Sequence, residues 1–249
     1  MNLYGLIGYP LGHSFSKKYF TKKFENEGLG DCFFELFPLP SIHEFSDLLR
    51  NNSALKGLAV TIPYKQSILP FLDTISPEAA QIGAVNCIQF KGNILMGYNT
   101  DVVGFEKSFM PLLHPHHKKA LVLGTGGASK AVQYILSKHA IPFTLVSRGG
   151  DGETGIINYD TIDQQVLNDH LIIINCSPLG MSPNEKSKPE LPYEYITEQH
   201  LLYDLVYGPV ETAFLSEGKK RGALIKDGYE MLELQAEENW RVWNNQDTI

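Results

Sequence analysis

A glycine-rich turn, Gly124-Thr125-Gly126-Gly127, has the residue types that bind a phosphate group. It follows an apolar stretch, Ala120–Leu123, and precedes a helical pattern over Ala128–Lys138. Such a turn lets a pyrophosphate reach the N–H groups at the start of the helix, because no side chain is in the way. The pattern predicts a dinucleotide site, although a ligand-free turn between strand and helix gives the same spacing. The residues expected beside the cofactor here are Gly124, Gly126, Gly127 and Ala128.

The end of the next expected strand indicates which dinucleotide would bind. An Asp or Glu about 20 residues past the first glycine would bind the ribose 2′-hydroxyl of NAD. Here the strand expected over 142–146 is followed by Ser147 and Arg148. The guanidinium of Arg148 offers a planar fork to a 2′-phosphate and a face on which adenine can stack. We therefore favour NADP, with Asp151 and Glu153 as the carboxylates that would argue for NAD.

Polar residues also gather where strands are expected to end in the first part of the chain, which is where α/β proteins bind ligands. Each has an ordinary structural explanation as well, because these residue types favour caps and turns. Serines cap helices, lysines are solvated on first turns, and an Asp can begin a helix. The candidates are Ser14, Ser16, Thr61, Lys65, Asn86 and Asp101.

Short apolar strands alternate with helical stretches, which is typical of an α/β protein. We expect two domains. Residues 1–101 would form a substrate domain with a mixed, mainly parallel sheet, and residues 102–228 a Rossmann-like, doubly wound NADP domain. The segment 229–249 would form a helix that packs back on the first domain. In that domain we expect strands over 3–7, 32–37, 57–62 and a hairpin over 89–96, with helices over 14–28, 42–49 and from Pro63 onward.

Composition excludes several classes of function. The formal net charge of −7 disfavours a nucleic-acid binder, which needs a basic face. No apolar run approaches the roughly 18 residues of a membrane helix, and the first residues lack a signal-peptide pattern. Three scattered cysteines favour a reducing cytoplasm. We expect no metal site, because His114, His116 and His117 flank a proline in an expected exposed linker. We expect a monomer or a homodimer that binds a small molecule.

Taken together, the motifs resemble those of the shikimate dehydrogenase family in type, spacing and order. The first half of the chain carries counterparts of its Gly-x-Pro-x-x-His-Ser-x-Ser, Val-Thr-x-Pro-x-Lys, Gly-Ala-x-Asn and Gly-x-Asn-Thr-Asp motifs. The second half carries the glycine turn, Asn-x-Ser-x-x-Gly-Met, Asp-x-Val-Tyr-x-Pro-x-x-Thr and Gly-x-x-Met-Leu-x-x-Gln. The matching segments are 8–16, 60–65, 83–86, 97–101, 124–131, 175–181, 204–212 and 228–235.

The resemblance implies an NADP-dependent oxidoreductase that acts on a CH–OH group. Its reaction would be the reversible reduction of 3-dehydroshikimate to shikimate, on the route to chorismate and the aromatic amino acids. Ser14 and Ser16 would bind the substrate carboxylate, with Tyr207 close by. The ring hydroxyls would be bound by Thr61, Lys65, Asn86, Asp101 and Gln235. The cofactor site would also include Ser147, Arg148, Met181 and Gly228.

Oxidation of a secondary alcohol needs a hydride acceptor and a group that handles the hydroxyl proton. Lys65 and Asp101 are the pair in these motifs suited to the proton. We expect them to contact each other and the reacting hydroxyl. Lys65 would either accept the proton or, if charged, stabilise the developing alkoxide.

One position departs from the family pattern. The motif has Asn two residues before Thr61, and this chain has Ala59. The loss of one hydrogen bond is worth about 1 kcal/mol, which is less than tenfold in affinity. Three alternatives stay open: a relative that uses quinate or NAD, a folate-methylene dehydrogenase with a similar architecture, and a shikimate-binding relative without catalysis. The serine pair, the Asn-Thr-Asp motif and Gln235 argue against the folate enzyme.

Overall fold

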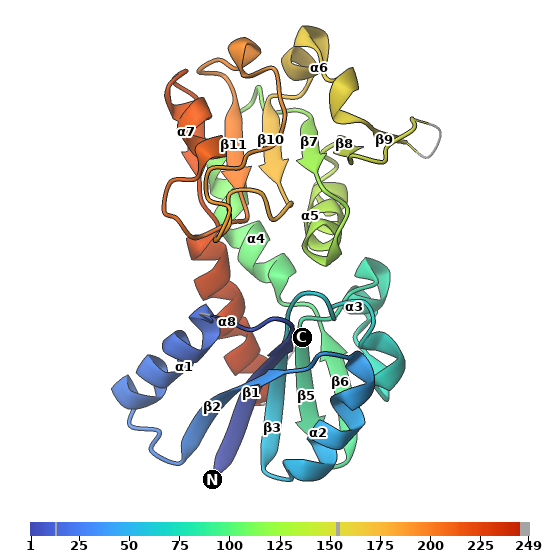
Figure 1. Cartoon of the computed structure of the whole chain (residues 1–249), viewed down its shortest axis with the longest axis vertical. Helices are drawn as coiled ribbons and strands as arrows, with labels where there is room; N and C mark the ends of the chain where they lie inside the picture. The colour runs from blue at the N-terminus through green and yellow to red at the C-terminus, as the bar shows by residue number, and fades with distance from the viewer. Residues whose placement is uncertain (13, 153–154, 245–249) are drawn as a thin grey trace. The chain divides into compact units, whose positions relative to one another are not determined.

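The computed structural model describes residues 1–12, 14–152 and 155–244 of the 249-residue chain (Figure 1). Glu153, one of the possible NAD-type ligands, and residues 245–249 of the expected last helix lie outside the described residues. The chain divides into two units by its internal contacts. One unit holds Met1–Thr100 and the chain from Ala236 onward, and the other holds Asp101–Gln235.

The sheet of the first unit is mixed and mainly parallel, as predicted. Its strand order is β2-β1-β3-β5-β6-β4. The pairs β1/β2, β1/β3 and β4/β6 are parallel, whereas the hairpin β5/β6 and the pair β3/β5 are antiparallel. The strands are β1 (Asn2–Gly8), β2 (Cys32–Pro38), β3 (Leu55–Val60), β4 (Thr74–Ile75), β5 (Cys87–Lys91) and β6 (Ile94–Tyr98).

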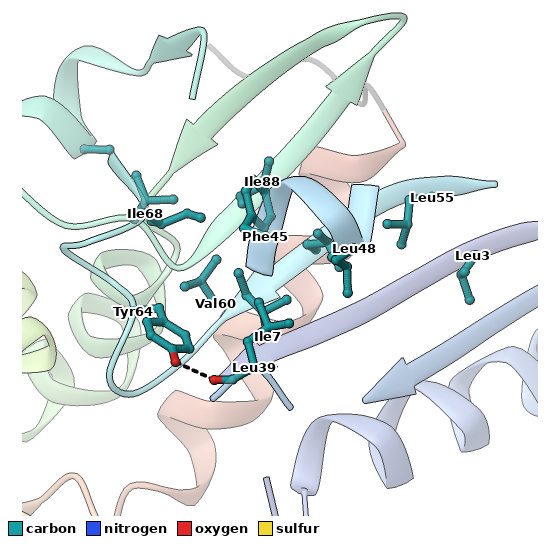
Figure 2. Close-up of a cluster of buried hydrophobic side chains, with 13 residues drawn as sticks. Leu3, Ile7, Leu39, Phe45, Leu48, Leu55, Val60, Tyr64, Ile68 and Ile88 are labelled. Carbon is teal, nitrogen blue, oxygen red and sulfur yellow. Dashed lines mark hydrogen bonds between the residues drawn. The ribbon is translucent and has the colours of Figure 1, made fainter. Parts of the chain in front are cut away.

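Apolar side chains alternate along the strands of this sheet, so each face has its own hydrophobic cluster. Leu3 and Ile7 of β1 belong to a cluster that includes Phe45 and Leu48 of α2 (Figure 2). Tyr4 and Leu6 of β1 belong to a second cluster on α1 and α8. The helices of this unit are α1 (Phe15–Asn26), η1 (Ile42–Glu44), α2 (Phe45–Asn51), η2 (Leu69–Phe71), α3 (Pro77–Ile82) and the second part of α8 (Tyr229–Trp243).

The helix predicted from Pro63 onward is wrong, because residues 62–68 form successive turns before η2. The backbone bonds there mix spacings of three and four residues, as in Tyr64 N–H to Thr61 O at 2.9 Å and Ile68 N–H to Tyr64 O at 3.0 Å. Pro63 and Pro70 bracket the segment, and neither has an N–H to donate to a helical ladder. The hydroxyl of Tyr64 donates to the carbonyl of Leu39 and fixes the segment over the core (Figure 2).

The second unit has the doubly wound sheet that the sequence predicts. Its order is β12-β11-β10-β7-β8-β9, and all of its pairs are parallel. Counted from β7, this is the 3-2-1-4-5-6 order of dinucleotide-binding folds, read from the β9 edge. The strands are β7 (Ala120–Leu123), β8 (Phe143–Val146), β9 (Ile156–Ile157), β10 (Ile172–Asn175), β11 (Leu201–Asp204) and β12 (Leu224–Lys226).

Helices pack on this sheet through side chains from alternate strand positions. Tyr203 of β11 packs edge-on against Phe105 and Phe109 of α4, and its hydroxyl lies 2.6 Å from that of Ser108. Leu202 belongs to a different cluster that includes Phe214 of α7. The helices of this unit are α4 (Asp101–Phe109), η3 (Met110–Leu112), α5 (Gly127–Lys138), η4 (Tyr159–Thr161), α6 (Gln164–Asp169), η5 (Tyr193–Tyr195), α7 (Ala213–Lys219) and the first part of α8.

The histidine-rich connection was expected to be exposed, and this prediction is only partly correct. His114 and His116 are exposed, but His117 is buried. The Nδ1 of His117 accepts the N–H of His114, and its Nε2 donates to the carbonyl of Gln199, each at 3.0 Å. His117 therefore fastens the connection to the unit. Across the described residues, no helix is long and apolar enough to cross a membrane, and no cluster of three His, Cys, Asp or Glu could hold a metal ion.

Candidate active site

Asn86, one of the predicted substrate ligands, is held by side-chain hydrogen bonds. It is buried just before β5, and its Oδ1 accepts the N–H of Thr100 at 2.7 Å. Its Nδ2 donates to the Thr100 hydroxyl at 3.0 Å. The Gly-Ala-x-Asn motif, which ends at Asn86, is thus tied to the Gly-x-Asn-Thr-Asp motif by side-chain hydrogen bonds. Asn86 therefore has a structural role, because these bonds orient the loop. An amide side chain has two donor and two acceptor positions, so it can also bind a ligand.

Thr61 and Lys65 lie on the segment that leaves β3, next to the loop that carries Asn86. The N–H of Val85 donates to the carbonyl of Lys65 at 2.7 Å, and the N–H of Val60 donates to the carbonyl of Asn86 at 2.8 Å. Both Thr61 and Lys65 are half-buried. The backbone bonds bring Thr61, Lys65 and Asn86 to one end of the sheet.

The first serine of the serine motif has a structural duty. Ser14 is the N-cap of α1, and its Oγ accepts the N–H of Lys17 at 3.4 Å. Ser16 lies in the first turn of the same helix and is half-buried. Gly8, with which the motif begins at the end of β1, packs against the residue after β3, since a Cβ on Gly8 would lie 2.4 Å from Cγ2 of Thr61. The serine motif and Thr61 therefore share one region of this unit.

Ala59 lies in a hydrophobic cluster. It is buried in the cluster that includes Cys87, Tyr98 and Trp243, and it pairs with Cys87 of β5. An amide at this position would face the α8 side of the sheet. The departure from the motif therefore replaces a polar side chain by a well-packed apolar one.

Asn99, which precedes Thr100 in the chain, has a buried side-chain oxygen that accepts no hydrogen bond from the described residues. Its Nδ2 donates to the carbonyl of Ala84 at 2.9 Å, which ties it to the loop before Asn86. Within the described part of the chain, its Oδ1 is the buried side-chain atom that has no hydrogen bond. A buried acceptor in this state costs free energy, so this loop is a place where a donor would be stabilising.

The glycine turn of the second unit fits a dinucleotide phosphate. Gly124 has φ of +108°, and a Cβ there would meet the backbone of Cys176 and Ser177 at 3.3 Å. Gly126 is the N-cap of α5 and makes no side-chain cap bond. A Cβ on Gly126 would meet no atom within 4 Å, so the space over the helix start is open. The N–H groups of the first turn, which begins at Gly127 and Ala128, are thus accessible to an anion.

Ser147 and Arg148 follow β8 directly, as predicted. Arg148 is exposed, and its carbonyl accepts the Nδ2 of Asn158 at 3.0 Å. The Oγ of Ser147 accepts the N–H of Gly149 at 3.5 Å. The backbone of the segment is therefore fixed while the guanidinium lies in solvent, which suits a charged group that meets a soluble phosphate.

Asn175, Asp204 and Thr212 form a buried hydrogen-bond network. They belong to the family motifs, but the sequence analysis assigned them no function. The Oδ1 of Asp204 accepts the Nδ2 of Asn175 at 2.9 Å, and its Oδ2 accepts the hydroxyl of Thr212 at 2.6 Å. Burial raises the pKa of Asp204 to about 6, although its hydrogen bonds oppose the shift. The network joins the loops after β10 and β11. The motif letters themselves were the signal for these residues, because Asn, Asp and Thr at strand ends are typical loop-fixing side chains.

The remaining predicted residues lie at several places in the second unit. Asp101 is buried at the start of α4, whereas Met181 is 41% exposed on the loop after β10. Tyr207 follows β11, and burial raises the pKa of its hydroxyl. Gln235 is buried on α8, and its Nε2 donates to the carbonyl of Leu232 at 2.9 Å.

Gly228 has a packing role that its motif position did not reveal. A Cβ there would lie 2.2 Å from the carbonyl oxygen of Leu205. Its N–H donates to the carbonyl of Val206 at 3.2 Å. Glycine is therefore required at this position so that the start of α8 can approach the loop after β11.

Comparison with known proteins agrees with this arrangement. The model of the shikimate dehydrogenase substrate binding domain matches residues 6–88. The NADP(+) shikimate dehydrogenase of Methanosphaera stadtmanae is 34% identical over 246 residues, which cover 92% of this chain and 86% of the relative. The chain belongs to the shikimate dehydrogenase family.

Solved structures extend the similarity to the fold of the shikimate dehydrogenases. The shikimate 5-dehydrogenase of Thermus thermophilus, in complex with NADP(H) and shikimate, has a TM-score of 0.85 and 30% identity. The alignment covers 98% of this chain and 93% of that one. The quinate dehydrogenase of Corynebacterium glutamicum, in complex with NAD, has a TM-score of 0.81 and 26% identity over 97% of this chain and 93% of its own. The predicted family and fold are confirmed.

Proposed function

We propose that this protein is an NADP-dependent shikimate dehydrogenase, which reversibly reduces 3-dehydroshikimate to shikimate in the biosynthesis of aromatic amino acids. The observation that carries the proposal is the match to the Methanosphaera enzyme over 92% of the chain, which includes both units. Motif residues of the first unit gather at one end of its sheet, and those of the second include the glycine turn and the loops after β8, β10 and β11. A chain that kept only the fold would have no need of both sets.

The second unit holds the cofactor in this proposal. Gly124, Gly126, Gly127 and Ala128 would hold the pyrophosphate of the cofactor, and the open space beside Gly126 supports that fit. Arg148 pairs with the 2′-phosphate, and Ser147 lies beside it. Met181 and Gly228 belong to the same site. Bound NADP supplies the hydride acceptor for alcohol oxidation.

The first unit holds most of the substrate. Ser14 and Ser16 donate to the carboxylate of the ring acid, with Tyr207 as a further donor. Thr61, Asn86 and Gln235 bind the ring hydroxyls. The half-buried state of Thr61 and Lys65 supports this assignment, because a ligand would complete their burial.

Lys65 and Asp101 handle the proton. Oxidation of shikimate removes a hydride from the ring carbon and a proton from its hydroxyl. Lys65 takes this proton or stabilises the alkoxide as the proton leaves, and Asp101 orients the lysine and binds the adjacent hydroxyl. In the reducing direction Lys65 returns the proton to the new alkoxide.

The test is the absorbance of reduced nicotinamide after the protein is mixed with shikimate and NADP, with NAD and quinate in parallel reactions. We expect reduction of NADP by shikimate. Arg148→Gln should lower kcat/KM for NADP about tenfold or more and leave that for NAD within about twofold, because one charge-assisted pair is lost. A folded protein that reduces neither cofactor would contradict the proposal.

The similarity to a quinate dehydrogenase in complex with NAD suggests a second candidate activity, the oxidation of quinate with NAD. Faster turnover of quinate than of shikimate, or of NAD than of NADP, would favour that activity. Binding of shikimate without turnover would favour a non-catalytic relative, a possibility suggested by Ala59.

The cell compartment and the assembly follow from the same proposal. We place the protein in the cytoplasm, because Cys32, Cys87 and Cys176 are all free thiols. We expect a monomer or a homodimer, which sedimentation of the purified protein would distinguish.

A further inference from the structure

A buried chain of hydrogen bonds runs from Asn86 through Thr100 to Asn239 on α8. Asn239 is 1% exposed and Thr100 is 2% exposed. The Thr100 hydroxyl lies 2.7 Å from Oδ1 of Asn239 and 3.1 Å from Oδ1 of Asn86. The family motifs quoted above contain Asn86 and Thr100 but not Asn239.

The direction of these bonds follows from the single proton of the hydroxyl. Oδ1 of Asn86 already accepts the N–H of Thr100, and Nδ2 of Asn86 needs an acceptor. The Thr100 oxygen can accept from Asn86 with good geometry when its own proton points elsewhere. Oδ1 of Asn239 takes that proton at the shorter of the two distances. With that proton directed to Asn239, the Thr100 oxygen can accept from Nδ2 of Asn86.

The position of Asn239 also relates it to Ala59. Gly57 of β3 packs on Trp243, since a Cβ on Gly57 would lie 2.2 Å from Cδ1 of the indole. Ala59, two residues further along β3, belongs to the same buried cluster as Ala236 and Trp243, which lie on either side of Asn239 in the sequence of α8. Ala59 also pairs with Cys87, the residue after Asn86.

We propose that Asn239 is a positioning residue that orients Asn86 toward the substrate through the hydroxyl of Thr100. It supplies from α8 the buried amide that the family motif places at position 59 of β3. The inference deepens the proposed function and rests on the substrate role of Asn86.

The first test compares Asn239→Ala with Asn244→Ala. Asn244 is an exposed residue beyond the end of α8 whose side chain bonds only to Trp240 in the contacts described. We expect Asn239→Ala to raise KM for shikimate about fivefold, the effect of one lost hydrogen bond. KM for NADP and kcat should stay within about twofold, because Asn86 binds the ground state and the transition state alike. Asn244→Ala should change none of these constants.

The coupling through Thr100 is tested by Thr100→Val in the same assay. Because both substitutions break one chain of bonds, the double variant should lose little more affinity for shikimate than either single variant. Additive losses would contradict transmission through Thr100. An unchanged KM for shikimate in a folded Asn239→Ala protein would overturn the proposal.

A readout independent of turnover separates this inference from the proposed function. The side-chain amide signal of Asn86 in ¹⁵N-resolved NMR spectra can be assigned by its loss in Asn86→Asp. It should shift in Asn239→Ala and stay in place in Asn244→Ala. A shift in a protein that fails to oxidise shikimate would support the hydrogen-bond chain and contradict only the function. An unshifted signal would overturn the chain itself.

The proposal that Asn239 replaces an amide at position 59 is tested by placing an asparagine back on β3. In the double variant Ala59→Asn/Asn239→Ala, the volume removed from α8 makes room for the new side chain. We expect KM for shikimate to fall back to within about threefold of the starting protein, because one buried hydrogen bond is regained. A folded double variant that binds no better than Asn239→Ala would contradict the exchange.

Discussion

Lys65 shows how a single residue can be placed by its backbone and used through its side chain. Its carbonyl accepts the N–H of Val85, and Tyr64 beside it is anchored to Leu39. The segment is a series of turns and not a helix, so its shape depends on these bonds. The backbone of Lys65 is therefore held in place without a regular element to carry it.

Removal of this side chain should affect chemistry and not folding. Lys65→Ala should lower kcat about a hundredfold or more, the usual contribution of a positioned proton-handling group, with little change in Tm. Lys56→Ala is the matched control, because Lys56 is an exposed lysine of β3. Steady-state kinetics and thermal unfolding of both variants provide the measurement. Near-normal turnover in Lys65→Ala would contradict the proton role.

Asp204 gives a pH dependence whose sign is opposite to that of a surface carboxylate. Burial raises its pKa from 3.8 to about 6. Between these values the folded state binds more protons than the unfolded state, so this group's contribution to stability falls as pH rises. The free energy of unfolding of the wild type should therefore fall relative to Asp204→Asn between about pH 4 and pH 7. Urea unfolding of both proteins at several pH values measures the difference, and a constant difference would refute the shifted pKa.

At the scale of elements, the start of α1 combines a cap with a proposed anion site. Ser14 caps the helix, whereas Ser16 lies within its first turn. Ser14→Ala should cost about 1 kcal/mol of stability and also raise KM for shikimate. Ser16→Ala should raise KM with little change in Tm. Denaturant unfolding and kinetics of the pair separate the two duties, and an unchanged KM in both variants would remove the serines from the substrate site.

Alanine substitutions at Gly126 and Gly228 should separate an effect on cofactor binding from an effect on stability. Gly126→Ala adds a methyl group in open space at an extended backbone position, so the protein should fold normally. Its KM for NADP should rise about tenfold or more, because the methyl group occupies the space proposed for the pyrophosphate. Gly228→Ala meets the Leu205 carbonyl and should lower Tm. NADP titrations and thermal melts distinguish the outcomes, and tight NADP binding by Gly126→Ala would contradict the cofactor site.

At the scale of the whole molecule, each unit has its own hydrophobic clusters, and the first unit needs both ends of the chain. Trp243 of α8 stacks on Tyr4 of β1 with ring centroids 5.1 Å apart, and its Nε1 donates to the carbonyl of Ile88 at 3.1 Å. The last helix is thus part of the core on one face of the first sheet.

Truncation of this side chain should act on one unit. Trp243→Ala should cost about 3–5 kcal/mol, as for other buried tryptophans. Binding of shikimate should weaken, whereas binding of NADP should be retained, because its proposed site lies wholly in the second unit. Calorimetric titration with each ligand, together with urea unfolding, tests this division. Equal loss of both ligands would show that the units do not fold independently.

The order of residues along the chain was enough to predict the alternation of strands and helices, the position of the glycine turn and the family. These features depend on local periodicity and on residue types at strand ends, both of which can be read along the chain. The glycine turn from Gly124 to Gly127 and the placement of Ser147 and Arg148 after β8 are examples, because each is fixed by a few neighbouring residues.

Features that join distant segments could not be predicted from the sequence and emerged only from the packed fold. The run from Pro63 was predicted as a helix, and its turns are held by bonds to Leu39 and Val85. His117 was predicted to be exposed, and it is buried against Gln199. The partnership of Thr100 with Asn239 spans 139 residues and leaves no local pattern. A hydrogen bond between such segments exists only once the sheet and α8 have packed, which is why a sequence pattern could name Asn86 but not the residue that orients it.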